Sequence, residues 1–323
     1  MRAARITRLD GPDAVEVGDI DEPTPQDGQV LIDVHAAGVS FPEVLQTRGR
    51  YQLKPELPFV PGSEVAGVVA SVPDGSGLGI GDRVAAFPLL GGFAERVVAA
   101  ADLVFALPDS LSYAAGAALP LNYLTAHFAL LTRGRMSAGE TVLVQGAAGG
   151  VGTASIQVAK AFGAGRVIAV TSTDAKAQVA RGAGADEVVA ADGFKDAVKD
   201  LTRGRGVDVV VDPVGGDRFT DSLRCLASAG RLLVIGFTAG DIPTVKVNRL
   251  LLNNIEVVGV AWGAYALQEP GSIGAQWKEL EPHIESGALL PPVGATYGLD
   301  DVVAALRDID ERRATGKIVL TLR

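Results

Sequence analysis

Four closely spaced glycines are the strongest candidates for ligand chemistry in this sequence. The apolar run TVLVQ ends directly before the first of them. The four are Gly146, Gly149, Gly150 and Gly152, and a segment of helical spacing that includes Val151 begins among the last of them. Glycine is required where a backbone turns sharply beside a pyrophosphate, and the free N–H groups at a helix start attract such an anion. The alternative is a tight strand-to-helix turn without a ligand. The strand before the turn and the helix after it favour a dinucleotide site.

The strand that follows bears on which dinucleotide is bound. An NAD site usually has Asp or Glu about 20 residues after the glycines, where the carboxylate holds the ribose hydroxyls. Here the run VIAV leads into Thr171, Ser172 and Thr173, with no carboxylate before Asp174, and Lys176 follows. Hydroxyls and a cation suit a 2′-phosphate better than a free ribose, which favours NADPH. The alternative is that Lys176 only solvates a helix face.

The composition excludes several classes of partner. The chain of 323 residues with 48% hydrophobic residues has enough material for two domains. Its 29 basic and 38 acidic residues give a net charge of -9, which argues against binding nucleic acid. No apolar run of about 18 residues predicts a membrane span, and the start lacks the apolar core of a signal peptide. The single Cys225 fits a reducing compartment, so we expect a cytoplasmic protein.

The pattern of elements changes near residue 121. Short strands with Gly and Pro between them, such as QVLIDVHAAGV, fill the first 120 residues and predict a β-barrel-like domain. Apolar runs then alternate with amphipathic helical segments, which predicts a doubly wound parallel sheet. Beyond Gly263 the pattern is irregular until a last helix and strand, which we expect to return to the first domain. The predicted fold class is α/β, with residues 1–121 and 264–323 in the first domain and 122–263 in the second.

Longer blocks of sequence resemble a known family. GETVLVQGAAGGVGTASIQVAK (139–160), AAGVSFPEVLQTRGRYQLKPELPFVPGSEVAGVV (36–69) and ALPLNYLTA (118–126) are similar to blocks of the quinone oxidoreductase branch of the medium-chain dehydrogenase/reductases. The resemblance spans nearly the whole chain. It implies a GroES-like β-barrel catalytic domain, a Rossmann NADP(H)-binding domain and a homodimer. We expect the dimer to form through the last Rossmann strand, IEVVGVA (255–261), because an unpaired edge strand invites aggregation.

The resemblance also raises the question of a metal. Zinc alcohol dehydrogenases of the superfamily carry Cys, His and Cys at positions where this chain has Ser40, Ser63 and Leu121. Of their zinc-site motifs, this chain keeps only the glutamate, Glu64. A serine hydroxyl is a poor zinc ligand and leucine is none. One cysteine cannot form the four-cysteine structural zinc lobe either. No metal is therefore expected, and three histidines without ligand spacing are expected to pack or to lie at the surface: His35, His127 and His283.

Cofactor contacts follow from the same resemblance. Thr125 is similar to a threonine near the nicotinamide, and Asn122 lies beside it. Arg313 matches an arginine that reaches the same phosphate as Lys176. Relatives often have Tyr where this chain has Ala191, so the preference for NADPH is expected to be weaker than usual. For three residues at strand ends, Val214, Gly236 and Phe237, ordinary packing is nearly as good an explanation as a cofactor contact. The full set of residues assigned to the cofactor is Asn122, Thr125, Gly146, Gly149, Gly150, Val151, Gly152, Ser172, Lys176, Val214, Gly236, Phe237 and Arg313.

The expected chemistry is hydride transfer to an acceptor that is already electrophilic. Without a metal to hold an alkoxide, a quinone or an enone is the natural small-molecule substrate. Negative charge then develops on an oxygen that needs a hydrogen-bond donor. By resemblance, Ser40 and Tyr51 occupy polar positions of the substrate site and are the predicted catalytic residues. Phe41 and Trp262 would add apolar walls, and Glu43 is expected at the surface or in a turn.

Two other functions remain open. An enoyl-thioester reductase has nearly the same architecture and would need basic residues for a phosphopantetheine, which TRGRYQLK (47–54) could supply. A non-catalytic NADPH-binding protein, structural or regulatory, is the second alternative. Turnover of NADPH with a quinone distinguishes an enzyme from a binding protein.

Overall fold

The chain crosses twice between two structural units. The computed structural model describes residues 1–323 and separates one unit formed by residues 1–121 and 291–323 from another formed by residues 122–290. The second boundary differs from the expected residue 264. Residues 264–290 pack with the second unit because Ile273, Trp277, Leu280 and Gln276 are buried there. Gln276 also donates to the backbone oxygen of Leu124 at 3.3 Å. The irregular sequence of this segment carries no periodic signal of that packing.

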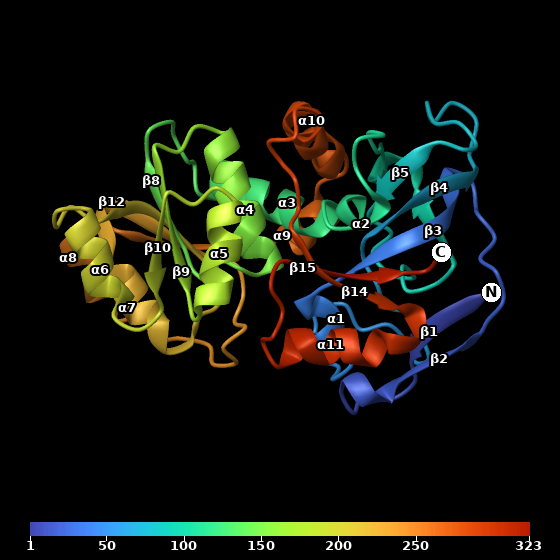
Figure 1. Cartoon of the computed structure of the whole chain (residues 1–323), viewed down its shortest axis with the longest axis horizontal. Coiled ribbons are helices and arrows are strands. Elements are labelled where there is room, and N and C mark those ends of the chain that lie inside the picture. Colours follow the sequence, from blue (N-terminus) through green and yellow to red (C-terminus); the bar gives the residue numbers. More distant parts are fainter. The chain divides into compact units, whose positions relative to one another are not determined.

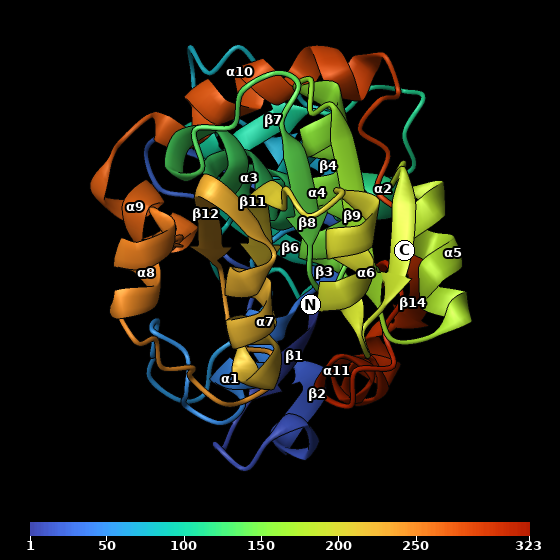
Figure 2. The same cartoon turned by 90° about the vertical axis from the view of Figure 1, so that its left-hand side faces the viewer.

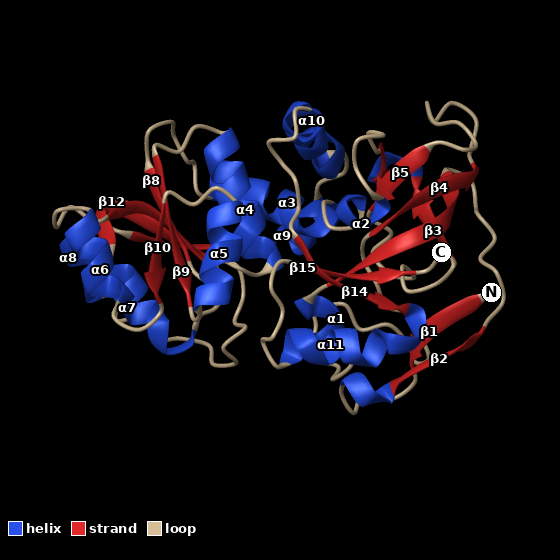
Figure 3. Cartoon of the chain, viewed as in Figure 1, coloured by secondary structure: helices blue, strands red, loops and turns tan.

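The first unit is built mainly from strands (Figure 3). The long strand β3 pairs with β15, β4 and β6, so a single strand holds much of the sheet together. The order across the sheet is β14-β15-β3-β4-β5-β7, and β1 and β2 form a separate hairpin. The strands are β1 (Arg2–Ile6), β2 (Val15–Asp19), β3 (Gln29–Val39), β4 (Val65–Ser71), β5 (Arg83–Ala86), β6 (Arg96–Ala100), β7 (Val104–Ala106), β14 (Val293–Gly298) and β15 (Lys317–Thr321).

Three short helices complete the first unit: α1 (Phe41–Gln46), α2 (Tyr113–Gly116) and α11 (Val302–Asp310). Alternating apolar residues of β3, namely Val30, Ile32 and Val34, are fully buried in a core that also receives Leu306 from α11. Because β15 pairs with β3 in antiparallel register, with Ile318 opposite Val39, the last helix and strand return to the first unit as the sequence predicts.

The second unit contains a sheet of six parallel strands in the order β10-β9-β8-β11-β12-β13. Helices α4 and α5 cover one face, and α6, α7 and α8 cover the other (Figures 1 and 2). The strands are β8 (Thr141–Val144), β9 (Arg166–Thr171), β10 (Glu187–Ala190), β11 (Val207–Asp212), β12 (Leu226–Val234) and β13 (Glu256–Gly259). The helices are α3 (Pro120–His127, beginning in the first unit), α4 (Gly150–Ala161), α5 (Asp174–Gly182), α6 (Phe194–Leu201), α7 (Phe219–Arg224), α8 (Asn248–Asn253), α9 (Trp262–Gln268) and α10 (Ser272–Glu285).

Buried strands of this sheet read as continuous apolar runs, as parallel strands covered on both faces must. Leu143, Ile168, Val210 and Leu232, from four neighbouring strands, are all fully buried. None of the helices in the chain combines the length and apolar composition needed to cross a bilayer.

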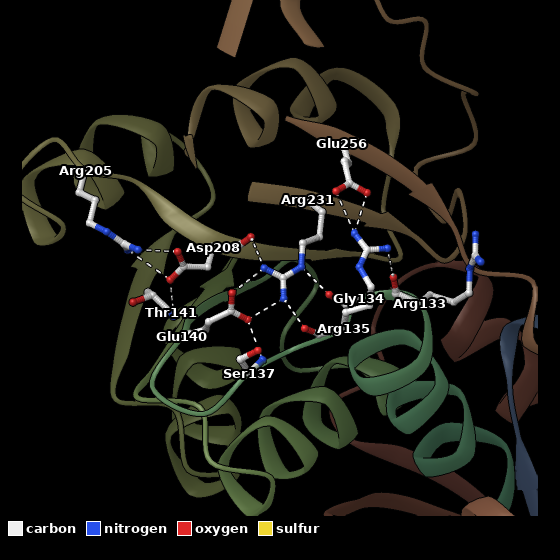
Figure 4. A network of polar contacts seen from close by, with 10 residues as sticks. All are labelled: Arg133, Gly134, Arg135, Ser137, Glu140, Thr141, Arg205, Asp208, Arg231 and Glu256. Carbon is white, nitrogen blue, oxygen red and sulfur yellow. Dashed lines mark hydrogen bonds and ion pairs between the residues drawn. The ribbon is translucent and has the colours of Figure 1, made fainter. Parts of the chain in front are cut away.

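A polar network joins the amino ends of the central strands (Figure 4). The guanidinium of Arg231 donates to both oxygens of Glu140, at 2.7 and 2.6 Å, and to the backbone oxygens of Gly134, Arg135 and Asp208. Arg231 pairs in register with the first residue of β13, and Glu140 directly precedes β8. The network therefore lies at the end of the sheet opposite the glycine turn, where it connects strands and does not face a ligand.

Candidate functional site

The order of the strands locates a switch point in the second unit. The chain runs outward from β8 to β9 and β10, then returns to β11 on the other side of β8. Parallel sheets bind ligands beyond the carboxyl ends of strands at such a point. The glycine turn follows β8, and Val214 follows β11. A Cβ at Gly146 would lie 3.0 Å from Cγ2 of Val214, so the two loops are in contact.

The glycine turn leaves no space for a side chain at Gly152 and favours glycine by its backbone conformation at Gly146. Gly146 has φ +57°, in the region that favours glycine, and Gly149 is the N-cap of α4. A Cβ on Gly152 would lie 2.7 Å from Cα of Ala147, and also against the backbone oxygen of Gly146. These glycines bring the start of α4 against the end of β8. The first-turn N–H groups of α4, including that of Val151, then point toward the switch point, where an anion could accept them.

Helix α3 supplies Asn122 and Thr125, both buried. A Cβ on Gly150 would lie 2.5 Å from Nδ2 of Asn122, so this amide lies directly over the glycine turn. Thr125 is three residues further along and shares the same helix face. The structure therefore places Asn122 beside the turn, and its contact with a cofactor stays a prediction.

Asp212 is a functional candidate that the sequence analysis missed. It ends β11 and is 2% exposed, and its Oδ1 accepts the N–H groups of Val214 and Gly215 at 2.9 Å each. Burial raises the pKa of this carboxyl, against the effect of the two N–H groups. Asp212 thus fixes the loop that carries Val214. The sequence does indicate this role of Asp212, because an aspartate before Pro-Val-Gly commonly closes a turn by accepting hydrogen bonds from the backbone that follows it.

The loops after β11 and β12 are hydrogen-bonded to each other. Ala239 donates its N–H to the backbone oxygen of Val214 at 2.9 Å. A Cβ on Gly215 would lie 2.8 Å from the ring of Phe237, which follows Gly236. The structure therefore brings Val214, Gly236 and Phe237 together at the carboxyl edge of the sheet.

Ser172 lies in the turn between β9 and α5, and Lys176 lies in the first turn of α5. Ser172 is exposed, and Thr173 caps α5 by accepting the N–H of Lys176 at 3.3 Å. Ala191 donates its N–H to the backbone oxygen of Thr171 at 2.8 Å, which places Ala191 at the same edge of the sheet. A hydroxyl and an ammonium thus lie near each other in sequence where β9 leads into α5.

Arg313 belongs to the first unit, and its partners there are carboxylates. Its guanidinium pairs with Asp308 at 2.7 Å and with Glu311. The positive charge is thus matched within the first unit. The contact of Arg313 with a cofactor phosphate stays a prediction, and this pairing competes with it.

The first unit holds a buried polar cluster, the Lys317 cluster, formed by Ser40, Glu43, Ser63, Glu64 and Lys317. Lys317 opens β15 and is 3% exposed, and its Nζ donates to Oγ of Ser40 and to Oε1 of Glu64. Both partners are buried as well. The cluster is therefore an ammonium held between a hydroxyl and a carboxylate.

Both glutamates of the cluster are fully engaged. Glu43 accepts the N–H of Ser40 at 2.9 Å with Oε2, and the hydroxyl of Ser63 at 2.8 Å with Oε1. Glu64 accepts the N–H of Leu121 at 2.8 Å with Oε2. Zinc-dependent relatives carry ligands at the positions of Ser40, Ser63 and Leu121. In this chain each of these residues donates a hydrogen bond to the carboxylate of Glu43 or Glu64.

The donors present at this point do not suit a zinc ion. Zinc prefers thiolate and imidazole, whereas the cluster offers hydroxyls and carboxylates beside an ammonium that would repel a cation. No group of three or more His, Cys, Asp or Glu side chains in the chain is arranged to hold a metal ion.

The expected surface position of Glu43 is wrong. Glu43 is 1% exposed, and burial raises its pKa to about 6, although the charge of Lys317 and the Ser63 hydroxyl lower it. The cause is local, because Glu43 is the third residue of α1 and closes a capping box with Ser40. The sequence Ser-Phe-Pro-Glu carries the S-x-x-E signal of such a box.

Tyr51 and Trp262 have different environments. Tyr51 is half-buried, and burial, followed by the charge of Glu43, raises the pKa of its hydroxyl. The hydroxyl therefore stays protonated at neutral pH and can donate its proton in a hydrogen bond. Trp262, expected in an apolar wall, is instead buried within the second unit, where its Nε1 donates to Oε1 of Gln276 at 2.9 Å. This contact helps to join α9 to α10.

Known proteins share both parts of this architecture. Residues 26–109 match the alcohol dehydrogenase GroES-like domain family, and residues 150–280 match the zinc-binding dehydrogenase family. Quinone oxidoreductase-like protein 2 of Bos taurus is 37% identical over 100% of this chain and 93% of its own length. The predicted fold class, a GroES-like domain with a Rossmann domain, is confirmed.

Solved structures agree over the full length. A probable oxidoreductase from Mycobacterium abscessus is 46% identical, with a TM-score of 0.90 over 100% of this chain and 99% of that one. The quinone oxidoreductase of Thermus thermophilus, solved also in complex with NADPH, is 35% identical, with a TM-score of 0.86 over 100% of both chains. The chain belongs to the quinone oxidoreductase branch of the medium-chain dehydrogenase/reductase superfamily.

Proposed function

We propose that the protein is a zinc-independent, NADPH-dependent oxidoreductase that transfers hydride to a quinone or an activated α,β-unsaturated carbonyl. The observation that carries the proposal is the glycine turn at the switch point, together with Ser172 after β9 and Lys176 in the first turn of α5, where β9 itself ends without a carboxylate and the first one is Asp174. The NADPH complex of the Thermus thermophilus relative supports the choice of cofactor.

The residues of the first unit indicate the kind of acceptor. When bound, NADPH supplies a hydride. The Lys317 cluster offers no thiolate or imidazole for a Lewis-acidic metal, so the acceptor has to be electrophilic by itself. Ser40 and Tyr51 provide protonated hydroxyls that can donate to the oxygen on which charge develops. A quinone or an enone meets both conditions.

The enoyl-thioester alternative has weaker support. Of the basic residues in segment 47–54, Arg48 pairs with Asp310 at 2.7 Å, which reduces its availability to a phosphopantetheine. Arg50 and Lys54 remain exposed at the surface. A panel of quinones, enones and enoyl thioesters, assayed by NADPH absorbance, tests the proposed function and compares these substrates. A non-catalytic protein would bind NADPH and consume none.

Replacing Lys176 with alanine should remove most of the preference for NADPH. We expect the wild type to prefer NADPH over NADH by about ten- to a hundredfold in kcat/KM, since charge-assisted hydrogen bonds contribute about 1.5–3 kcal/mol each and exposure reduces them. Lys176→Ala should weaken NADPH kinetics alone. Lys199→Ala, on the distant helix α6, is the control. Equal use of both cofactors by the wild type, or equal harm to both by Lys176→Ala, would contradict this assignment.

We also propose a cytoplasmic homodimer joined through β13. This strand is an edge of the second unit's sheet, and α8 beside it in sequence exposes Leu251 and Leu252 at 76% and 74%. Pairing with a second copy would cover the edge and these side chains. Sedimentation should show a dimer at micromolar concentration, and Leu251→Asp with Leu252→Asp should shift it toward monomer. A wild type that sediments as a monomer would refute this proposal.

A further inference from the structure

The position of Lys317 in the sheet brings a cation to the predicted catalytic serine. Because Ile318 pairs with Val39, the residue before Ile318 lies beside the residue after Val39, which is Ser40. Gly38 allows Glu64 to approach this point closely, since a Cβ on Gly38 would lie 2.7 Å from Oε1 of Glu64. An ammonium in this position costs desolvation that only specific partners offset. Its partners are Ser40 and Glu64.

The proton of Ser40 makes only one long hydrogen bond within the cluster. Oγ of Ser40 accepts from Lys317, so its own proton has to be donated elsewhere. Within the cluster the hydroxyl donates to Oε1 of Glu64 over 3.4 Å, which is a long hydrogen bond to an oxygen that also accepts from Lys317. Glu43 is occupied by Ser63 and by the backbone of Ser40. A hydroxyl that accepts from a cation is polarised and becomes a stronger donor.

We propose that Lys317 is a positioning residue that acts through Ser40, orienting and strengthening its hydroxyl as the donor to the substrate's carbonyl oxygen. This inference rests on the proposed function. When hydride reaches the conjugated carbon, the electron pair of the double bond moves to oxygen and NADP⁺ forms. The resulting oxyanion accepts the hydrogen bond of Ser40, and a proton from solvent completes the reduction. The buried ammonium thus supplies fixed positive charge two hydrogen bonds away from the reacting oxygen, with Ser40 between them.

The test compares Lys317→Met, Ser40→Ala and the double variant. Each single variant should lower kcat with the best quinone or enone by about 10- to 100-fold, the range of a hydrogen bond to a charged group. The dissociation constant for NADPH should not change. In the Ser40→Ala background, Lys317→Met should have little further effect, because the two residues act as a unit. Lys160→Met, which breaks an exposed ion pair with Asp186, is the control.

A second pair of variants separates catalysis from folding. Lys317→Met leaves the charge of Glu64 buried without its partner, so Lys317→Met with Glu64→Gln restores the net charge that the cluster has in the wild type. This folded variant should retain NADPH binding and keep the low kcat. Full activity in it, or an undiminished effect of Lys317→Met in the Ser40→Ala background, overturns the role of Lys317. A wild type without any turnover overturns the proposed function instead.

Discussion

Gly152→Ala should abolish NADPH binding, with a dissociation constant raised more than about a hundredfold, or roughly 3 kcal/mol. The added methyl group would lie 2.7 Å from Cα of Ala147 and against the backbone oxygen of Gly146. Backbone atoms cannot rotate away as a side chain can, so the turn has to open and the start of α4 has to move from β8. The N–H groups that we assign to the pyrophosphate then lose their positions. Fluorescence titration with NADPH measures the effect.

Two alanine variants make this result specific. At Gly150 the new methyl group would meet the amide of Asn122, a side chain that can move, so a smaller loss of affinity is expected. At Gly182, near the end of α5, nothing lies within 4 Å, and NADPH affinity should not change. Circular dichroism confirms that each variant is folded. Wild-type affinity in folded Gly152→Ala would show that the turn is structural only.

Arg231→Leu should destabilise the second unit by about 3–5 kcal/mol, the usual cost of removing one partner from a buried ion pair. Arg231 is 7% exposed, and its loss leaves the carboxylate of Glu140 with only the N–H of Ser137 and removes this donor from three backbone oxygens (Figure 4). Urea unfolding followed by circular dichroism measures the change. At low urea, the folded variant should bind NADPH as the wild type does, because the network lies at the opposite end of the strands.

Arg224→Leu is the matched control for this prediction. Arg224 forms an exposed ion pair with Asp221 at 2.8 Å, and exposed pairs contribute about 0–1 kcal/mol. If the free energy of unfolding falls by the same small amount in Arg231→Leu and Arg224→Leu, the Arg231 network does not hold the strands together. A loss of NADPH affinity in stable Arg231→Leu would instead place the network near the ligand.

Local patterns made much of the fold and part of the site predictable. The glycines, Val151 and the alternation of strands and helices in the second unit are encoded within about 20 residues of sequence, and the structure arranges Gly146, Val214 and Phe237 at one edge of the sheet. The capping box of Ser40 and Glu43 was equally local, although its burial was not expected.

Long-range contacts were not predictable in this way. Lys317 meets Glu64 across 253 positions of the sequence and Ser40 across 277, and the segment GKIVL shows no sign of a buried cation. The packing of residues 264–290 and the burial of Trp262 depend on Gln276, whose amide has partners from α3 and α9. Such contacts arise from the register of a sheet or the docking of helices, which a periodic pattern does not specify.

The consumption of NADPH by purified protein, after dialysis against EDTA, tests the central claim most directly. NADPH absorbance is followed with a quinone, an enone and an enoyl thioester, and again with NADH. Our account predicts turnover with the quinone or the enone that survives the chelator and is faster with NADPH than with NADH. Activity that is lost with EDTA and restored by zinc, turnover with the thioester alone, or NADPH binding without any turnover would contradict it.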